Sequence, residues 1–364
     1  MKNDIGPRVQ QDIKSMHLTQ LEDYFESIGE QRFRARQVFS WLHKGVRAFT
    51  DMTDLSLKLR NILDGEFYIS FPELIDKQTS KIDGTVKYLW HVRGDDAIES
   101  VLMEHAHGNT ICISTQAGCK FGCVFCASAI GGFKRNLAAS EMLDQVLFSA
   151  LDADRRISNV VLMGIGEPLD NFENVMRFIK LVSHPHGVNI GARHLTLSTC
   201  GVIENIDRLS EYSVQLTLAV SLHAPDDETR SRLMPVNRET GVRNLFDACG
   251  RYFSKTGRRV TYEYAMIDMV NDSPDQAALL AELLKNTGSH LNLILLSGVT
   301  ERALKPSPKE SVDKFTRVLG QKGVNFTVRR SLGVDIEAAC GQLRRKNLNS
   351  TETVNGVMGS NRQR

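Results

Sequence analysis

The chain is 364 residues long, and its 45 lysines and arginines nearly balance its 43 aspartates and glutamates, which leaves a formal net charge of +2. This balance excludes a globally basic nucleic-acid-binding protein, so any contact with nucleic acid has to come from a local basic patch. No apolar run approaches the roughly 18 residues of a membrane span and the first residues lack a signal-peptide pattern, so we expect a cytoplasmic protein without membrane contact. The length predicts one large catalytic domain with a smaller module, and an odd number of cysteines favours a reducing compartment over a disulfide framework.

Residues 1–65 predict a small helical module, because their apolar residues recur at the three- and four-residue spacing of an amphipathic helix. The second predicted helix and the turn after it, residues 32–47, carry a basic face formed by Arg32, Arg34, Arg36, Lys44 and Arg47. Two interpretations stay open for this face. It is either simply solvated or a surface for RNA phosphates, with Phe33, Trp41 and His43 available to stack on bases.

Residues 66–104 change to short alternating runs with an Asp-Gly pair at 83–84, which predicts a small β extension built on a hairpin. From 105 to 345, apolar strand-like runs alternate with helical stretches, as in βα units around a parallel sheet. The predicted strands are 111–114, 160–163, 195–198, 216–222, 261–266, 292–295 and 326–329. The expected fold class is therefore α/β: a partial (β/α) TIM-like barrel with its chemistry at the carboxyl ends of the strands, an N-terminal helical module and a small sheet. Residues 346–364 are polar and without period, so we expect a disordered tail.

Three cysteines stand in a C-x3-C-x2-C spacing on the loop after the first predicted barrel strand, namely Cys119, Cys123 and Cys126. Three thiolates can bind three irons of a [4Fe-4S] cluster and leave the fourth iron open, whereas a structural zinc normally takes four protein ligands. An open iron can bind S-adenosylmethionine (SAM), and one electron from the cluster then cleaves the sulfonium to a deoxyadenosyl radical. The alternative interpretation is a zinc site completed by Cys112, His105 or His107.

The run 164–168, Gly-Ile-Gly-Glu-Pro, directly follows a predicted strand, where glycine lets the backbone approach a ligand and Glu167 can accept a hydrogen bond from an ammonium group. A dinucleotide-binding G-x-G-x-x-G pattern is excluded, because Leu169 occupies the place of the third glycine. Two further strand ends, 197–199 and 220–223, place small polar groups on the same rim. These groups suit a methionyl carboxylate and ribose hydroxyls.

Five motifs follow one another along the chain: the cysteine triad, the GxGEP run, Leu-Ser-Thr at 197–199, Ser-Leu-His at 221–223 and Ala-Ala-Cys-Gly-Gln-Leu at 338–343. In this order they resemble the motifs of the RlmN family of dual-specificity RNA methyltransferases, which belongs to the radical SAM superfamily. The resemblance covers nearly the whole chain, from about residue 33 to 343. It implies one [4Fe-4S] cluster on the three cysteines and two molecules of SAM consumed per turnover. The residues that it implies for SAM binding are Gly166, Glu167, Ser198, Ser221, Leu222, His223 and Ser297. Ser297 departs from the family, which commonly has asparagine there, a side chain with longer reach and an amide.

The resemblance also implies a chemical route. Carbon 2 of adenine is electron-poor and cannot attack the SAM methyl group as a nucleophile, so a radical route is needed. In the family, a first SAM methylates the cysteine that matches Cys340, and the deoxyadenosyl radical from a second SAM takes a hydrogen from that S-methyl group. The methylene radical then adds to adenine, which is covalent catalysis by a cysteine. Glu99 matches the base that removes the proton from the modified carbon, and Cys112 matches the thiol that releases the product through a transient disulfide with Cys340.

The implied function is methylation of adenine C2 in 23S ribosomal RNA, near the peptidyl transferase centre, and in tRNA next to the anticodon. The implied partners are 23S rRNA, tRNA and an electron donor such as flavodoxin or ferredoxin, and we expect a monomer. The stretch 131–136, which contains Lys134 and Arg135, is predicted to touch the RNA backbone.

Three alternatives remain from the residues. A sister enzyme type methylates carbon 8 of the same ribosomal adenine and gives antibiotic resistance, but Pro168 and Ala117 favour carbon 2. A zinc-stabilised RNA-binding protein would use the cysteines without catalysis. An activase that makes a glycyl radical on a protein partner would need neither Cys340 nor a basic helical module. Cys200 and Cys249 fall in no motif and are interpreted as structural cysteines.

Overall fold

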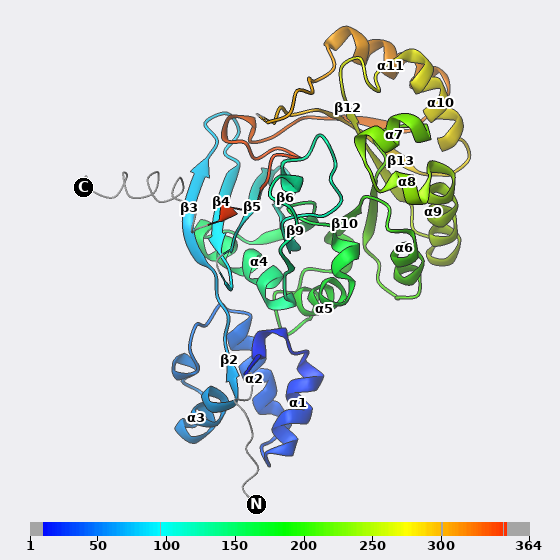
Figure 1. Ribbon diagram of the computed structural model, residues 1–364. Coiled ribbons are helices and arrows are strands. Elements are labelled where there is room, and N and C mark those ends of the chain that lie inside the picture. Colours follow the sequence, from blue (N-terminus) through cyan, green and yellow to red (C-terminus); the bar gives the residue numbers. More distant parts are fainter. Residues whose placement is uncertain (1–9, 95, 300, 345, 348–364) are drawn as a thin grey trace, which may run out of the picture.

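The computed structural model describes residues 10–94, 96–299, 301–344 and 346–347. A small N-terminal module lies beside a much larger barrel (Figure 1). Its helices are α1 (Leu18–Ser27), α2 (Arg32–Leu42) and α3 (Leu57–Glu66), as the apolar spacing predicts. Their apolar faces close over a core in which Leu21, Phe25 and Val38 are completely buried. Two short strands, β1 (Gln11–Asp12) and β2 (Phe67–Tyr68), pair in parallel and bring the two ends of the module together.

One large sheet organises the rest of the molecule, in the order β14-β13-β12-β11-β10-β9-β6-β5-β4-β3. The strands from β6 to β14 are parallel and form the partial barrel: β6 (Gly108–Cys112), β9 (Ile157–Leu162), β10 (Leu195–Thr199), β11 (Thr217–Ser221), β12 (Val260–Met266), β13 (His290–Leu295) and β14 (Phe326–Arg329). Consecutive residues of the central strands are buried, which is what a parallel sheet with a filled interior and an outer helical layer requires. The partial barrel expected from the βα pattern is therefore confirmed.

Helices cover the outer face of this sheet (Figure 1). They are α4 (Ala139–Ala153), α5 (Phe172–Val182), α6 (Ile203–Ser210), α7 (Asp227–Leu233), α8 (Asn237–Thr240), α9 (Val242–Thr256), α10 (Pro274–Leu284) and α11 (Lys309–Gln321). Within the described residues, no helix is both long enough and apolar enough to cross a membrane.

The β extension continues the barrel sheet. Its strands β3 (Glu73–Thr79), β4 (Val86–His91) and β5 (Asp96–His105) are antiparallel, and β5 also pairs with the first barrel strand, β6. The hairpin expected at the Asp-Gly pair joins β3 to β4.

The C-terminal segment corrects one prediction. Its first residues were expected in a disordered tail, but Lys346–Asn347 form β15, which pairs with Asp96 and Ala97 of β5. The physical reason is that β6 pairs only with 101–105 of β5, which leaves the hydrogen-bonding edge at 96–97 available to another strand. The remainder of the expected tail, 348–364, lies outside the described residues.

Candidate active site

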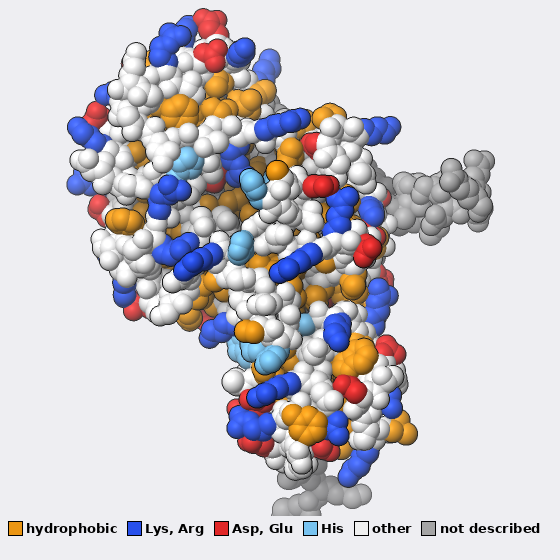
Figure 2. All heavy atoms as spheres, turned by 180° about the vertical axis from the view of Figure 1, so that it is seen from behind, with side chains coloured by type: hydrophobic (Ala, Val, Ile, Leu, Met, Phe, Trp, Pro, Cys, Tyr) orange, Lys and Arg blue, Asp and Glu red, His pale blue; other side chains and the backbone are white. Residues whose placement is uncertain are grey.

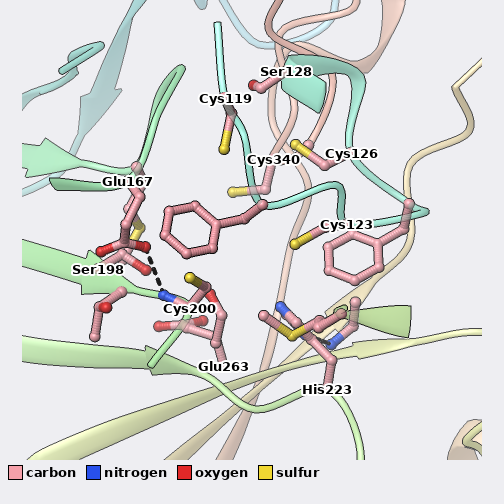
Figure 3. Close-up of a pocket in the computed structure, with 18 of the residues that line it drawn as sticks. Cys119, Cys123, Cys126, Ser128, Glu167, Ser198, Cys200, His223, Glu263 and Cys340 are labelled. Carbon is pink, nitrogen blue, oxygen red and sulfur yellow. Dashed lines mark hydrogen bonds between the residues drawn. The ribbon is translucent and has the colours of Figure 1, made fainter. Parts of the chain in front are cut away.

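A pocket opens at the carboxyl ends of β9 to β13, where barrel chemistry is expected. We call it the cluster pocket. The three cysteines of the triad line one side, while the strands and the turns that follow them contribute Glu167, Ser198, His223 and Glu263 on the other (Figure 3). Phe125 and Ser221 also line the pocket. The fold thus gathers the sequence motifs into one cavity.

The three thiols fit an iron-sulfur cluster. Burial raises the pKa of Cys119 to about 12, and burial together with the neighbouring Cys126 and Cys119 thiols raises the pKa of Cys123. Thiols held this close in a buried pocket become thiolates only beside strong positive charge, which iron provides. Within the described part of the chain, no three side chains of the metal-binding types stand at the separations of ligands to a single ion. The choice between a cluster and one zinc therefore rests on the number of thiols, because three thiolates can bind three irons of a [4Fe-4S] cluster whereas a structural zinc normally takes four protein ligands.

The Gly-Ile-Gly-Glu turn after β9 depends on glycine at position 166. Gly166 has a φ of +102°, and a Cβ there would lie 2.5 Å from the Gln116 Cβ. The turn aims Glu167 into the sheet end, where its carboxylate accepts hydrogen bonds from the backbone N–H groups of Leu169 (3.0 Å) and Cys200 (2.7 Å; Figure 3). Burial nevertheless raises the pKa of Glu167. A ligand ammonium group at this carboxylate would offset the burial.

His223 is held in an unusual conformation at the end of β11. Its φ is +57°, in the left-handed region that non-glycine residues rarely adopt, and such positions cluster at functional sites. The Ala265 N–H donates to its Nδ1 at 2.9 Å, so the proton of the neutral ring is on Nε2. Burial lowers the pKa of His223 to about 3, which keeps the ring neutral at physiological pH. The Phe125 ring packs edge-on against it with a centroid distance of 4.7 Å.

Five of the seven predicted SAM-binding residues line the cluster pocket: Gly166, Glu167, Ser198, Ser221 and His223. Two do not. Leu222 is completely buried, its N–H donates to the Glu263 carbonyl, and its own carbonyl accepts from Arg230. Ser297 is 8% exposed and lies just past its neighbour Leu296, which does line the pocket.

Glu263 is a site residue that sequence reasoning missed. It lies on β12 beside Ser221 of β11 and is only 4% exposed. Its Oε1 accepts from Asn292 Nδ2 at 2.9 Å, but its Oε2 is buried without a hydrogen-bond partner among the described residues. Burial raises its pKa. The available signal was an acidic residue inside an otherwise apolar strand, Val-Thr-Tyr-Glu-Tyr-Ala-Met. Cys200 was likewise interpreted as structural, yet it lines the cluster pocket, and its backbone orients Glu167.

Cys340 connects the cluster pocket to a second cavity, which we call the seam pocket. The seam pocket lies where the partial barrel does not close, between β5, β6 and β9 on one side and β13, β14 and the segment 330–343 on the other. Cys340 lines both pockets, whereas Cys112 lines only the seam pocket. Burial raises the pKa of Cys112 to about 12, and the nearby Cys340 thiol adds to this shift. Both are free thiols in the structure, so the implied disulfide is not present in this state.

Glu99 lies on the same sheet as Cys112. It is two residues before Val101, which pairs with Cys112 and lines the seam pocket, so the three side chains share one face of the sheet. The Glu99 carboxylate is 2% exposed, accepts from the Arg344 N–H at 2.9 Å and lies 3.8 Å from Lys87 Nζ. Glu99 is not itself among the described residues that line either pocket.

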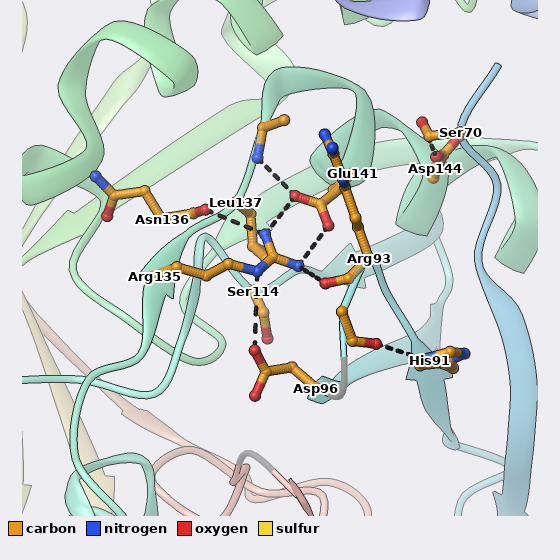
Figure 4. A network of polar contacts seen from close by, with 12 residues as sticks. Ser70, His91, Arg93, Asp96, Ser114, Arg135, Asn136, Leu137, Glu141 and Asp144 are labelled. Atoms are coloured by element: carbon orange, nitrogen blue, oxygen red, sulfur yellow. Dashed lines mark hydrogen bonds and ion pairs between the residues drawn. The ribbon is translucent and has the colours of Figure 1, made fainter. Parts of the chain in front are cut away.

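Arg135 lies in the stretch 131–136 that is predicted to touch RNA, and the structure gives it partners within the protein. Its guanidinium binds both oxygens of Glu141, at 2.7 and 2.8 Å, and the carbonyl of Arg93 (Figure 4). The hairpin of β7 (Gln116–Ala117) and β8 (Arg135–Asn136) therefore uses Arg135 to anchor the cluster loop. Lys134 is exposed and keeps its charged group available.

Part of the basic face of the module is neutralised internally. Arg32 and Arg36 lie 3.2 and 3.6 Å from Glu22 of α1, and Arg34 packs on the Phe33 ring. Lys44 and Arg47 have no carboxylate partner among the described residues. Both interpretations of this face therefore stay open, and Lys44 and Arg47 are cations with which an RNA phosphate could still pair.

Comparison with known proteins shows the family of the chain. The Ribosomal RNA large subunit methyltransferase N-terminal domain family matches residues 11–69, and the Radical SAM superfamily matches residues 113–281. A protein of Thermoanaerobacter sp. (strain X514) named "Probable dual-specificity RNA methyltransferase RlmN" is 48% identical over 338 residues, which cover 92% of this chain and 98% of that protein. A protein of the same name from Alkaliphilus metalliredigens is 46% identical, over 94% of this chain and 97% of its own length.

Among solved structures, a radical SAM methyltransferase from Sphaerobacter thermophilus superposes with a TM-score of 0.87 at 40% identity, over 92% of this chain and 99% of that one. The agreement extends across both the module and the barrel. The chain therefore belongs to the RlmN family of the radical SAM superfamily.

Proposed function

We propose that this enzyme methylates carbon 2 of adenine in 23S rRNA, near the peptidyl transferase centre, and in tRNA next to the anticodon, through an S-methylcysteine at Cys340. The observation that carries the proposal is that Cys340 lines both the cluster pocket and the seam pocket. A methyl group on its sulfur would face SAM on one side and a substrate base on the other. A zinc-stabilised binding protein would have no use for such an arrangement.

Each site residue has a defined task. Cys119, Cys123 and Cys126 hold the cluster, which supplies, when bound, the electron that cleaves SAM to a deoxyadenosyl radical. Cys340 carries the methyl group, loses a hydrogen atom from it and bonds through the resulting methylene carbon to the base. Glu99 takes the proton from the modified carbon, and the unpaired electron of the adduct would return to the oxidised cluster.

Cys112 then releases the product. Its thiolate attacks the Cys340 sulfur, which forms the disulfide and leaves the carbon on the base, where a proton completes the methyl group. Because the raised pKa of Cys112 keeps it a neutral thiol, it needs a base before it attacks.

The cofactor and partner assignments follow from this scheme. One cluster is bound per chain, and two molecules of SAM are consumed per turnover, one for the methyl group and one for the radical. SAM is bound by Gly166, Glu167, Ser198, Ser221 and His223. Leu222 supports the site through its backbone, and Ser297 supports it at the rim. A flavodoxin or ferredoxin reduces the cluster, and the enzyme works as a cytoplasmic monomer.

The division of the chain follows the same scheme. Residues 1–65 are an accessory module that binds RNA, 66–104 a β extension and 105–345 the catalytic barrel. Lys44 and Arg47, which have no carboxylate partner among the described residues, support its role in RNA binding.

The test is to express the chain in a bacterial host that lacks its own carbon-2 methyltransferase and to digest ribosomal and transfer RNA separately. Mass spectrometry then quantifies 2-methyladenosine and 8-methyladenosine. We expect 2-methyladenosine in both pools. Recovery of 8-methyladenosine alone would assign the chain to the resistance-type sister, and neither product from protein with an intact cluster would refute the proposal.

The order of the two thiol steps has its own prediction. Cys340→Ala should retain the cluster and SAM cleavage but lose all RNA methylation, because the carrier of the methyl group is gone. Cys112→Ala should instead accumulate RNA bonded covalently to the protein, because the bond to the base forms but its release fails. Denaturing gel electrophoresis with labelled RNA distinguishes the two variants, and an adduct in Cys340→Ala would contradict the assignment.

A further inference from the structure

The seam pocket combines apolar walls with basic residues. Its walls are apolar side chains from strands far apart in the sheet order, including Val101 of β5, Val161 of β9, Ile294 of β13 and Val328 of β14. Val328 is 42% exposed, which is unusual for an apolar residue beside a catalytic thiol. A flat base inserted between these walls would cover them and lie against Cys340 and Cys112.

The charges at the mouth of the seam pocket are unbalanced. Its two acidic residues are engaged, because Glu104 pairs with Arg155 at 2.6 Å and Asp83 accepts from the backbone N–H groups of Thr85 and Gly333. Arg329 and Arg330 are exposed, and neither guanidinium makes an ion pair or a hydrogen bond within the described residues. The mouth therefore offers two uncompensated cations next to an apolar slot.

We propose that Arg329 and Arg330 bind the phosphates that flank the target nucleotide of the RNA, and thereby position its base between the apolar walls of the seam pocket. The inference rests on the proposed function, since it names the place where that substrate enters. Guanidinium groups bind phosphate oxygens in bidentate fashion, and a base taken out of its stack needs apolar or aromatic surfaces on both faces. The opening beside β14, the last strand of the parallel part of the sheet, lets a nucleotide reach Cys340 from the side of the barrel while SAM occupies the cluster pocket.

The experiment compares the double variant Arg329→Gln/Arg330→Gln with Arg317→Gln. Arg317 is a matched control, because it is an exposed arginine on α11, next to β14 in the chain, and it does not line the seam pocket. Fluorescence anisotropy with a short RNA hairpin that carries an unpaired adenosine gives Kd at several salt concentrations. We expect the double variant to bind RNA roughly tenfold more weakly or worse. The slope of the logarithm of the binding constant against the logarithm of the salt concentration should fall by roughly 0.7 for each phosphate that the protein no longer neutralises. Arg329→Lys/Arg330→Lys should recover most of the slope, and Arg317→Gln should keep it.

A second readout separates this inference from the proposed function. Methylation of Cys340 by SAM, measured by intact-protein mass spectrometry without RNA, reports the cluster pocket alone. If the wild-type protein makes 2-methyladenosine but the double variant binds RNA with unchanged affinity and salt slope, the nucleotide site proposed here is wrong. The proposed function then still stands. Wild-type protein that methylates Cys340 but modifies no RNA would refute the proposed function itself.

Discussion

At the scale of single residues, the site contains two buried carboxylates in different states. Both oxygens of Glu167 accept backbone hydrogen bonds, so its position is set by the protein. Glu263 has one oxygen on Asn292 and one buried without a partner among the described residues. A buried acceptor without a donor is unfavourable in the free protein, and such groups persist where a ligand supplies the donor. We therefore attribute to Glu263 a hydrogen bond to a hydroxyl or ammonium group of SAM.

This assignment predicts opposite effects of Glu263→Gln on binding and on stability. SAM affinity should fall by roughly 10- to 100-fold, because a hydrogen bond to a charged group contributes about 1.5–3 kcal/mol. The SAM-free protein should become more stable, because an amide is easier to bury than a carboxylate. Equilibrium dialysis and thermal unfolding measure the two effects, with the exposed Glu310→Gln as the control. An unchanged SAM affinity in protein with full iron content would exclude the contact.

At the scale of elements, the hairpin of β7 and β8 holds the cluster loop in place. Gly118 lies so close to the opposite turn that a Cβ would stand 1.8 Å from the Gly132 carbonyl oxygen, and its φ is +82°. Arg135 connects this hairpin to the start of α4 through Glu141, which is 7% exposed, and lies 3.8 Å from Asp96 of β5. The basic residues 134 and 135 are adjacent in sequence but have different environments.

The difference predicts that neutral substitutions at the two positions will separate stability from RNA binding. Arg135→Gln should destabilise the protein by about 1–3 kcal/mol, because it leaves the Glu141 carboxylate buried without its charged partner. Lys134→Gln should change the free energy of unfolding by less than about 0.5 kcal/mol. If Lys134 contacts the RNA backbone, its variant should also lower the salt slope of RNA binding. Chemical denaturation gives the free energies, and equal destabilisation by both variants would contradict this division of roles.

At the scale of the whole molecule, the N-terminal module is fastened to the barrel by buried polar groups. Lys14 of the module and Asp144 of α4 form an ion pair of 2.6 Å with side chains 0% and 2% exposed, and Arg177 of α5 donates to the Ser15 carbonyl. Histidines also gather where the module meets the barrel (Figure 2). The His43 ring lies 4.0 Å from that of Phe39, which in turn contacts His184 at 4.8 Å.

This junction predicts that the protein loses stability in mild acid. Burial lowers the pKa of His43 and of His17 to about 4, from 6.5, and the positive groups Lys14, Arg177 and Lys180 oppose their protonation further. Between these values the unfolded chain binds more protons than the folded one, so stability falls as pH drops from about 6.5 to about 4. For the buried His43 the loss is at most about 1.4 kcal/mol per pH unit, and it is smaller for the half-exposed His17.

Urea unfolding at pH 7, 6 and 5 measures this dependence. His43→Phe keeps an aromatic ring beside Phe39 but removes the titrating group, so its stability should depend less steeply on pH. The same slope in wild type and variant would show that the acid sensitivity arises elsewhere.

Much of the fold and part of the site could be predicted from the sequence. The barrel strands are runs of apolar residues separated by helical periods, and this pattern is local. The cysteine triad and the glycine turn are local too, because their spacing along the chain places their groups on one loop. Glu263, Arg135 and the strand β15 could not be predicted this way. Each depends on a part of the chain that is distant in sequence. Glu263 depends on the pocket that it lines, Arg135 on a carboxylate of α4, and β15 on an unpaired edge of β5.

By itself, the sequence determined the chemistry that the chain can carry: three thiols on one loop, an acidic glycine turn, and a separate cysteine near the C-terminus. These are covalent spacings and residue types, which folding does not alter. Only the tertiary structure decided how they meet, because the curvature of an unclosed sheet brings β5 and β6 opposite β13 and β14 and leaves a gap between them. The segment 330–343 covers that gap and sets Cys340 between two pockets. Burial, which depends on everything packed around a group, then decided which carboxylates and arginines remained available for a ligand.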